Sequence, residues 1–392
     1  MSRSPSEGSE PNDQQAELRV VLAQLLTEVP GGIGRYAAEL TAALVATTPA
    51  GRGVVGIVPA ASEAELARVR AAVPGLDELV ALPRSRRALS LAWQLGAVSR
   101  AELPPGSATH GTSQLVPLTR PRRGSTVVAT VHDVVAFTHP STLTPYGAQW
   151  HRAMARRAAR WADAVVVPTR AVADELGGLL DFGDRIRVIG GAPSSALAID
   201  ADADARAAAL DLPAAYVLAV GTLEPRKGLD VLVAAMAHPA APDLPLVVAG
   251  PPGWGDVDLA SLAAAAGLDP SRLRVLGRVD DADLAVAYAR ASAFCMPSRA
   301  EGFGLPIVEA MSLGAPVVHS DAPALVEVAG GAGIAVPLAP AEGYPARLAE
   351  ALAAAVEPGR AAALRAAGLA RAATFSWRDA AERVWALHAD LR

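Results

Sequence analysis

Cysteine is nearly absent from this sequence of 392 residues: Cys295 is the only one, so no disulfide can form within the chain. Because Cys295 lies in an apolar run, we interpret it as a buried structural thiol. No apolar run is long enough to span a membrane, and no basic and then apolar leader begins the sequence, so we expect a cytoplasmic protein. Without paired cysteines or an H-E-x-x-H motif, the sequence also predicts no metal site.

Lysine is just as rare, and no part of the chain is clearly basic. The formal net charge is −5, which argues against nucleic acid as a partner. Arginine does gather in three clusters of the first half, which predict either a solvated face or a weak peripheral contact with an anionic membrane. The clusters are Arg84, Arg86 and Arg87; Arg120, Arg122 and Arg123; and Arg152, Arg156, Arg157 and Arg160.

The length of the chain suits two domains rather than one core. Residues 1–17 are polar and predict a disordered tail. After them, aliphatic runs alternate with helical patterns, and the alternation restarts after a linker at residues 192–205. Strand–helix alternation repeated in this way predicts two doubly wound α/β domains with parallel sheets. We expect these domains at residues 18–195 and 206–374, followed by an amphipathic helix within 375–392.

The expected elements follow from residue type and period. The predicted strands are Leu18–Leu25, Val54–Pro59, Thr126–Val131, Ala164–Val167, Ile186–Ile189, Ala215–Val220, Leu246–Ala249, Leu273–Leu276 and Ala293–Met296. The predicted helices include Arg35–Ala46, Ser62–Ala72, Tyr146–Trp161, Arg170–Leu179 and Trp377–Leu391.

A glycine-rich loop, Glu28–Gly34, follows the first predicted strand. Gly32, Gly34 and Ala37 match the G-x-G-x-x-A fingerprint of dinucleotide-binding folds, which would indicate an NAD-dependent oxidoreductase. Two features count against that interpretation. The loop is longer than the tight dinucleotide turn, and no acidic residue follows the second strand to hold a ribose. The loop is therefore a candidate ligand site, with the oxidoreductase kept as an alternative.

Other chemistry-bearing residues follow predicted strands, at the sheet edge where α/β folds bind ligands. His132 and Asp133 end the run V-H-D, and His110 ends a shorter strand-like stretch. Arg226 and Lys227 lie in the loop of AVGTLEPRKGL, just before a predicted helix. Cations there oppose the helix dipole unless an anion such as a diphosphate lies between them and the backbone N–H groups. Lys227 is the only lysine of a chain with 34 arginines, and its ammonium group suits a point contact with phosphate.

The stretch PSRAEGFGLPIVEAMSLGAPVV, residues 297–318, is the most informative of the chain. Glu301 lies in the loop after a predicted strand, and Glu309 follows after seven intervening residues, in what we expect to be the first turn of a helix. The residues between them start that helix, and their backbone N–H groups suit a phosphate. They begin with Gly302, Phe303, Gly304 and Leu305.

Together these motifs resemble glycosyltransferase family 4: the E-x7-E pair, the GGIGRY segment, the V-H-D run and the Arg–Lys pair. The resemblance implies the GT-B fold, in which two Rossmann-like domains face each other across a cleft and the last helix crosses back to the first domain. It also implies a retaining transferase that moves a hexose from a nucleotide-diphospho-sugar without a metal. The forms GTLEPRK and EGFGLP are similar to mannosyl- and rhamnosyltransferase members, so GDP-mannose is the expected donor. The expected acceptor is a glycan, a lipid-linked saccharide or a small molecule.

The resemblance also assigns roles. Arg226 and Lys227 would offset the charge of the leaving diphosphate, Glu301 and His132 would position the donor sugar, and Glu309 would hold the ribose hydroxyls. The catalytic set is Glu301, His132, Lys227 and Arg226. The donor-binding set is Gly32, Gly34, Arg226, Lys227, Gly302, Phe303, Gly304, Leu305 and Glu309. Thr222 stands where many members have arginine, which leaves open whether Arg226 replaces that arginine. A sugar-nucleotide-binding protein without transferase activity is the second alternative.

Overall fold

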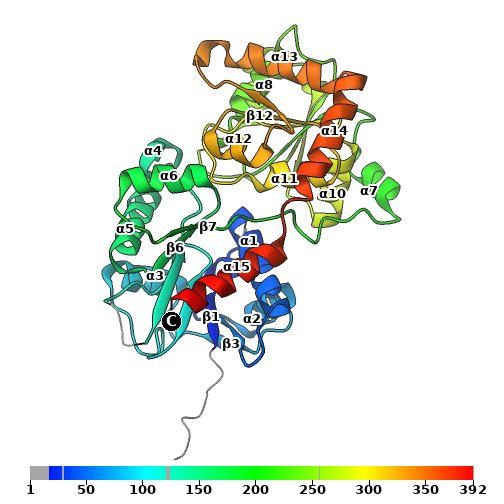
Figure 1. Ribbon diagram of the computed structural model, residues 1–392. Helices are drawn as coiled ribbons and strands as arrows, with labels where there is room; N and C mark the ends of the chain where they lie inside the picture. Colours follow the sequence, from blue (N-terminus) through cyan, green and yellow to red (C-terminus); the bar gives the residue numbers. More distant parts are fainter. Residues whose placement is uncertain (1–16, 29–30, 121–123, 256, 392) are drawn as a thin grey trace, which may run out of the picture.

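The computed structural model describes residues 17–28, 31–120, 124–255 and 257–391. Two parallel sheets organise the chain, and Figure 1 shows each with helices packed around it, in two parts that meet along one side. All but the last residue of the predicted tail at 1–17 lies outside the described residues.

The first sheet has seven parallel strands in the order β3-β2-β1-β4-β5-β6-β7. Most of its inner strands are buried and rich in aliphatic residues, as in parallel sheets whose two faces are covered by helices. The central strand β4, Ala-Thr-His-Gly, is buried but largely polar. The strands are β1 Leu18–Val21, β2 Val54–Val58, β3 Glu78–Ala81, β4 Ala108–Gly111, β5 Thr126–Thr130, β6 Ala164–Val167 and β7 Ile186–Val188. The helical segments around them are η1 Ala23–Leu26, α1 Gly31–Ala46, α2 Glu63–Ala72, α3 Arg86–Leu95, α4 Val135–Thr138, η2 Pro140–Thr142, α5 Pro145–Trp161 and α6 Arg170–Leu179.

The structure differs from the prediction at the first strand and at the glycine-rich segment that follows it. β1 ends at Val21, and the apolar residues that follow form the 3₁₀ turn η1 instead of a longer strand. Helix α1 begins at Gly31, so Gly32 and Gly34 lie within it rather than in a loop. Glycine is a weak helix former, but the contacts of α1 override that preference here. Residues 29 and 30 of the predicted loop lie outside the described residues.

The second sheet has six parallel strands in the order β10-β9-β8-β11-β12-β13. The strands are β8 Val217–Val220, β9 Leu246–Ala249, β10 Leu273–Gly277, β11 Ala293–Met296, β12 Val317–Ser320 and β13 Ile334–Val336. The helical segments are α7 Ala203–Ala209, η3 Pro225–Lys227, α8 Leu229–Ala237, α9 Leu259–Ala266, η4 Pro270–Arg272, α10 Asp281–Arg290, α11 Leu305–Ser312, α12 Pro323–Ala329, η5 Ala341–Gly343, α13 Tyr344–Val356, α14 Pro358–Ala372 and α15 Trp377–Asp390. Helix α7 starts inside the predicted linker.

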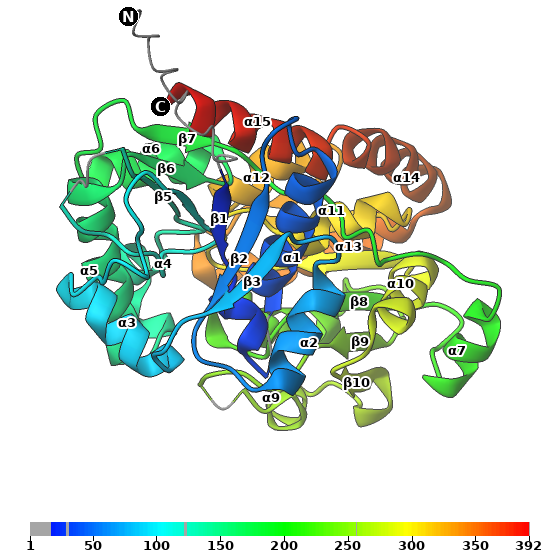
Figure 2. The same ribbon diagram turned by 90° about the horizontal axis from the view of Figure 1, so that it is seen from below.

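Helix α15 crosses back to the first sheet, as the family resemblance predicted. Figure 1 shows it beside α1, in the part of the molecule that holds the first sheet, and Figure 2 shows it running from the end of α14 towards β7. Its apolar side, which includes Val384 and Trp385, belongs to the same buried cluster as Leu40 and Leu44 of α1. The indole N–H of Trp385 donates to the carbonyl oxygen of Leu44 at 3.2 Å. The end of the chain therefore helps to build the core around the first sheet.

Candidate active site between the two sheets

The loop that carries Glu301 joins β11 to α11 and is shaped by two glycines with different functions. Gly304 has φ +86° and precedes α11, a left-handed conformation that favours glycine. A Cβ on Gly302 would lie 1.7 Å from the carbonyl oxygen of His132 in the first domain. Gly302 was expected to admit a ligand to the backbone. In this structure it instead lets the backbone of the opposite domain approach.

The carboxylate of Glu301 meets both cations that the sequence placed beside it. Arg226 NH1 lies 2.9 Å from Oε2, and Lys227 Nζ lies 2.7 Å from Oε1. The three side chains are almost buried, with exposed fractions of 15% for each cation and 9% for Glu301. Burial alone would raise the pKa of Glu301, but the charges of Arg226 and Lys227 outweigh it and lower this pKa to about 2. Glu301 is therefore ionised at any physiological pH.

The loop of Arg226 and Lys227 is held against the Glu301 loop. Gly228, at φ +67°, leads into α8, and a Cβ there would lie 2.4 Å from the carbonyl oxygen of Pro297. Arg299 binds Asp230 at the start of α8 through two contacts of 2.9 and 2.6 Å. The sequence patterns missed this arginine, although it lies only two residues before Glu301. Its bidentate contact ties the two loops together, so the cations and the carboxylate keep their relative positions.

Glu309 is the fifth residue of α11, so it lies just past the first turn in which it was predicted. Its side chain is buried, and Oε2 accepts a hydrogen bond of 3.1 Å from the hydroxyl of Tyr288. Arg35 of α1, in the first domain, brings its Nε to 3.5 Å from Oε1. Burial raises the pKa of Glu309, while Arg35 and Tyr288 act in the opposite direction. Oε1 accepts no hydrogen bond from any described residue, so it keeps a free acceptor.

His132 is partly buried in the first domain, next to Tyr36. Their rings meet edge to face at 4.8 Å. Nε2 of His132 lies 2.8 Å from the carbonyl oxygen of Thr112, and because a carbonyl only accepts, this nitrogen carries the proton. Burial lowers the pKa of His132, so the ring is neutral at pH 7 with its proton on Nε2. His110, the weaker candidate, does not reach the cleft: it is buried 3.3 Å from His388 of α15.

The remaining predicted donor residues lie around the facing ends of α1 and α11. A Cβ on Gly32 would lie 3.9 Å from Cδ1 of Leu305, so these two positions are close across the domains. The ring of Phe303 packs edge to face on Phe375 at 5.7 Å. Leu305 is the first residue of α11, so its backbone N–H lies at the helix N-terminus. Gly34 is buried inside α1, and glycines inside a helix do not form the turn that a dinucleotide needs.

Polar contacts hold the two domains together in this arrangement. Arg35 pairs with Asp281 at 2.5 Å. The hydroxyl of Thr169 donates to the carbonyl oxygen of Gly302 at 3.0 Å. The carboxylate of Glu327 accepts from the backbone N–H groups of Arg170 and Ala171 at 2.8 Å each, at the start of α6. These contacts hold the two domains directly against each other beside Glu301 and Glu309.

The predicted basic surface is only partly available. Arg84 pairs with the buried Glu102 at 3.1 Å, and a guanidinium nitrogen of Arg157 donates to the carbonyl oxygen of Leu118. Arg156 is exposed. Two members of the clusters, Arg122 and Arg123, lie outside the described residues. In the part of the chain that the structure describes, no helix is both long and apolar enough to cross a membrane.

Comparison with known proteins agrees with this geometry. Residues 30–192 match the family described as Glycosyltransferase Family 4, and residues 214–357 match Glycosyl transferases group 1. The fold is similar to sucrose-phosphate synthase from Thermosynechococcus elongatus, with a TM-score of 0.73 and 21% identity over 96% of this chain and 98% of that chain. It is also similar to HepE from Anabaena in complex with UDP and glucose, with a TM-score of 0.70 and 18% identity over 96% and 100%. The two sheets and these neighbours define the GT-B class of fold. The chain belongs to glycosyltransferase family 4.

Curated relatives match part of the chain. The O-antigen chain mannosyltransferase B of Escherichia coli is 38% identical over 42% of this chain and 43% of its own length. The D-inositol 3-phosphate glycosyltransferase 1 of Catenulispora acidiphila is 35% identical over 58% and 57%. The phosphatidyl-myo-inositol mannosyltransferase of Mycobacterium tuberculosis is 39% identical over 41% and 43%. The matches thus span about half the length of these relatives.

Proposed function

We propose that this protein is a retaining glycosyltransferase that transfers a hexose from a nucleotide-diphospho-sugar to an acceptor hydroxyl, without a metal ion. The observation that carries the proposal is the convergence of Arg226 and Lys227 on Glu301, in the loop that leads into α11. Two largely buried cations beside a loop that leads into a helix suit a diphosphate. Membership of family 4 supports the same reaction class.

In this proposal the two cations act on the leaving group. As the bond between C1 of the sugar and the diphosphate breaks, negative charge grows on the phosphate oxygens, and Arg226 and Lys227 stabilise it electrostatically. The acceptor hydroxyl attacks C1 on the face from which the diphosphate departs, and the departing phosphate takes the hydroxyl proton. Glu301 and the neutral His132 position the donor sugar. No protein nucleophile takes part.

The nucleoside is assigned to Glu309, in the helix α11 that follows the same loop. Glu309 is ionised when it binds, and its free Oε1 can accept hydrogen bonds from the ribose hydroxyls. Arg35 and Tyr288 already hold the carboxylate in place. Because Arg35 belongs to the first domain, nucleotide binding would be sensitive to whether the cleft is closed.

GDP-mannose is our proposed donor, because two of the relatives named above are mannosyltransferases. The proposed acceptor is a glycan or a lipid-linked or small-molecule saccharide bound by the first domain. Two relatives are named for D-inositol 3-phosphate and phosphatidyl-myo-inositol. A weak peripheral contact with anionic membrane through the exposed arginines is compatible with a lipid-linked acceptor. We assign no nucleic-acid partner.

A donor panel tests the function. The melting temperature is measured with GDP-, UDP-, dTDP- and ADP-sugars and with NAD, because a ligand at 100 times its Kd stabilises the folded state by about 2.7 kcal/mol. We expect GDP-mannose to raise it most. Slow hydrolysis of the same donor should persist in excess EDTA, and the transferred sugar should keep its anomeric configuration. Stabilisation by NAD alone would favour the oxidoreductase alternative, and binding without hydrolysis or transfer would favour a binding protein.

Loss of hydrolysis in EDTA that Mg²⁺ restores would contradict the metal-independent site. Two aspartates of the D-A-D-A-D string at residues 200–204 pair with arginines: Asp202 with Arg206 at 3.0 Å, and Asp204 with Arg290. No group of three His, Cys, Asp or Glu side chains is arranged to hold a metal within the described ranges.

A further inference from the structure

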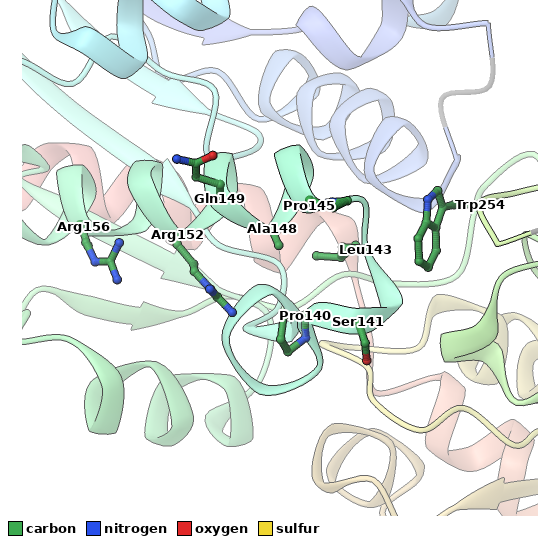
Figure 3. Close-up of a pocket in the computed structure, with 9 residues that line it drawn as sticks. All are labelled: Pro140, Ser141, Leu143, Pro145, Ala148, Gln149, Arg152, Arg156 and Trp254. Atoms are coloured by element: carbon green, nitrogen blue, oxygen red, sulfur yellow. The ribbon is translucent and has the colours of Figure 1, made fainter.

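A hollow of about 580 Å³ opens beside the catalytic loops, between the two domains (Figure 3). Its volume lies within the range of small-molecule sites. Eight of its lining residues come from the first domain and one from the second. They are Pro140, Ser141, Leu143, Pro145, Ala148, Gln149, Arg152, Arg156 and Trp254.

One face of helix α5 forms the floor of this hollow. Pro145, Ala148, Gln149, Arg152 and Arg156 recur at helical spacing and so lie along a single side of the helix. Figure 3 shows the two arginines following one another along the helix. The helix begins within the hollow, so its positive dipole end faces the same space.

The charge of the hollow is all of one sign. Its two ionisable lining residues are Arg152 and Arg156. Within the described part of the chain neither forms an ion pair with a carboxylate, whereas Arg35, Arg226 and Arg299 do. Nε of Arg152 donates to the carbonyl oxygen of Ala136 at 2.6 Å, which orients its guanidinium group. Two arginines without carboxylate partners predict an oxyanion, most simply a phosphate.

The opposite wall is an exposed aromatic ring. Trp254 has 40% of its surface exposed and lies in the loop after β9. This loop is fixed to the loop of the catalytic cations. Leu223 and Pro252 form a β-bridge, and a Cβ on Gly253 would lie 2.5 Å from Cγ2 of Thr222. An exposed, positioned tryptophan offers an apolar face to a sugar ring.

Both walls continue directly into the candidate active site. On the first-domain side, Asp133 follows His132, and its carboxylate accepts from the backbone N–H of Val135 in α4 at 3.1 Å. The chain then passes through α4 and η2 into α5. On the other side, the bridge at Leu223 precedes Arg226 and Lys227 by only a few residues. The hollow therefore adjoins the loops that carry the reacting groups.

We propose that the hollow binds the acceptor, and that the acceptor is a saccharide that carries a phosphate. The sugar ring packs on Trp254, and the phosphate lies on Arg152 and Arg156. This inference rests on the proposed transferase function and adds the chemical class of the acceptor. Because Trp254 belongs to the donor-binding domain, the acceptor site is complete only in the closed state.

The test is binding of a soluble probe, mannose 1-phosphate, by saturation-transfer NMR and calorimetry, with neutral mannose and inorganic phosphate as comparison ligands. Saturating GDP is present throughout, so that the diphosphate site is occupied. We expect mannose 1-phosphate to bind more tightly than either comparison ligand. Arg156→Gln should weaken its binding about fivefold, as for a partly exposed ion pair, without changing the binding of mannose. Trp254→Ala should weaken both mannose 1-phosphate and mannose, and Trp254→Phe should restore part of this loss.

Two matched controls come from the same helix. Arg160→Gln and Tyr146→Ala alter exposed residues of α5 that do not line the hollow, and they should bind the probe like the wild type. Unchanged affinity in both Arg156→Gln and Trp254→Ala, or equal affinity for mannose and mannose 1-phosphate, would overturn the inference. Donor hydrolysis by the wild type, which needs no acceptor, tests the transferase function separately.

A second probe distinguishes the source of the phosphate. It is the same sugar phosphate esterified with a ten-carbon isoprenoid chain. Tighter binding than the soluble probe would assign the phosphate to a lipid-linked saccharide, and weaker binding would assign it to a soluble sugar phosphate. Either result supports a phosphate-bearing acceptor, whereas failure of both probes to bind would reject it.

Discussion

Lys227 Nζ lies 2.7 Å from Oε1 of Glu301, and the other oxygen of the same carboxylate meets Arg226 at 2.9 Å. In the absence of a donor, Glu301 thus neutralises the two cations that we assign to the diphosphate. A bound diphosphate would compete with Glu301 for them and leave the carboxylate available for the sugar hydroxyls. The ion pairs are almost buried, so their strength depends on every partner remaining charged.

The pH dependence of stability should report this cluster. The pKa of Glu301 is about 2 in the folded protein, against an ordinary value of 4.5. A lowered folded-state pKa contributes stability that is fully present above pH 4.5 and is lost as the pH falls towards 2. This difference between the two pKa values corresponds to roughly 3 kcal/mol of folding free energy at neutral pH. The variant Glu301→Gln lacks this contribution, so its stability gap to the wild type should be constant from pH 7 to 5 and shrink below pH 4.5. Urea denaturation measures the gap, and a gap that does not change between pH 7 and 3 would contradict the assignment.

Ionisation of Glu309 should affect the stability of the folded protein in the opposite direction. Because burial raises its pKa, keeping Glu309 ionised in the folded protein costs stability at neutral pH. Glu309→Gln removes that cost, so its melting temperature should equal or exceed that of the wild type at neutral pH. The same substitution removes charge-assisted hydrogen bonds to the ribose and should weaken nucleoside diphosphate binding about tenfold. Thermal melts and calorimetry with GDP measure the two effects.

The comparison with Glu301 sharpens that test. Glu301→Ala should leave the affinity for free GDP nearly intact while it reduces turnover, because Glu301 is assigned to the sugar. Equal losses of GDP affinity in Glu301→Ala and Glu309→Ala would show that the division of roles is wrong.

The sequence predicts those parts of the site that are built from residues close together in the chain. Glu301, Gly304 and the start of α11 follow a buried strand within one short stretch, so residue type and spacing predict their arrangement. Glu309 was placed in the first turn but lies just past it, because the helix starts at Leu305, and a cap at a left-handed glycine is hard to locate from sequence. Arg35 lies 274 positions before Glu309, and only the packing of the two domains brings it there.

The two further partners were missed for similar reasons. Tyr288 lies in α10 among apolar residues, so the sequence predicts a core residue there. Its hydroxyl nevertheless contacts Glu309. Trp254 lies in a loop whose relation to α5 depends on domain closure. Local sequence patterns contain no information about contacts of this kind.

Gly302 should control closure of the cleft. Its φ is not in the left-handed region, so alanine suits the backbone itself, but the added Cβ would lie 1.7 Å from the carbonyl oxygen of His132 across the cleft. Gly302→Ala should therefore fold, because each sheet keeps its own core, and should lose transfer at least about a hundredfold, since misplacement of reacting groups by about 1 Å can cost that much. Gly178→Ala, in α6 with open space around its Cβ position, is the matched control and should remain active. Small-angle X-ray scattering with saturating GDP-mannose should show the variant more open than the wild type, and equal compactness together with full activity would contradict this account.

The chain's only lysine gives the sharpest test of the transferase site. The stem of Lys227 packs on Gly221, with Cε 3.5 Å from the position of a Cβ there, so a wider guanidinium group has little room beside Arg226. If Lys227 contacts the leaving diphosphate, it acts mainly as charge develops, and turnover should fall more than donor affinity. Lys227→Ala should lose about a hundredfold or more in turnover, and Lys227→Arg at least about tenfold, or roughly 1.4 kcal/mol of barrier. The exposed control Arg160→Lys should have wild-type kinetics. Steady-state rates paired with thermal melts measure these effects. Wild-type turnover in Lys227→Arg would refute the assignment, and so would a loss of activity that only parallels unfolding.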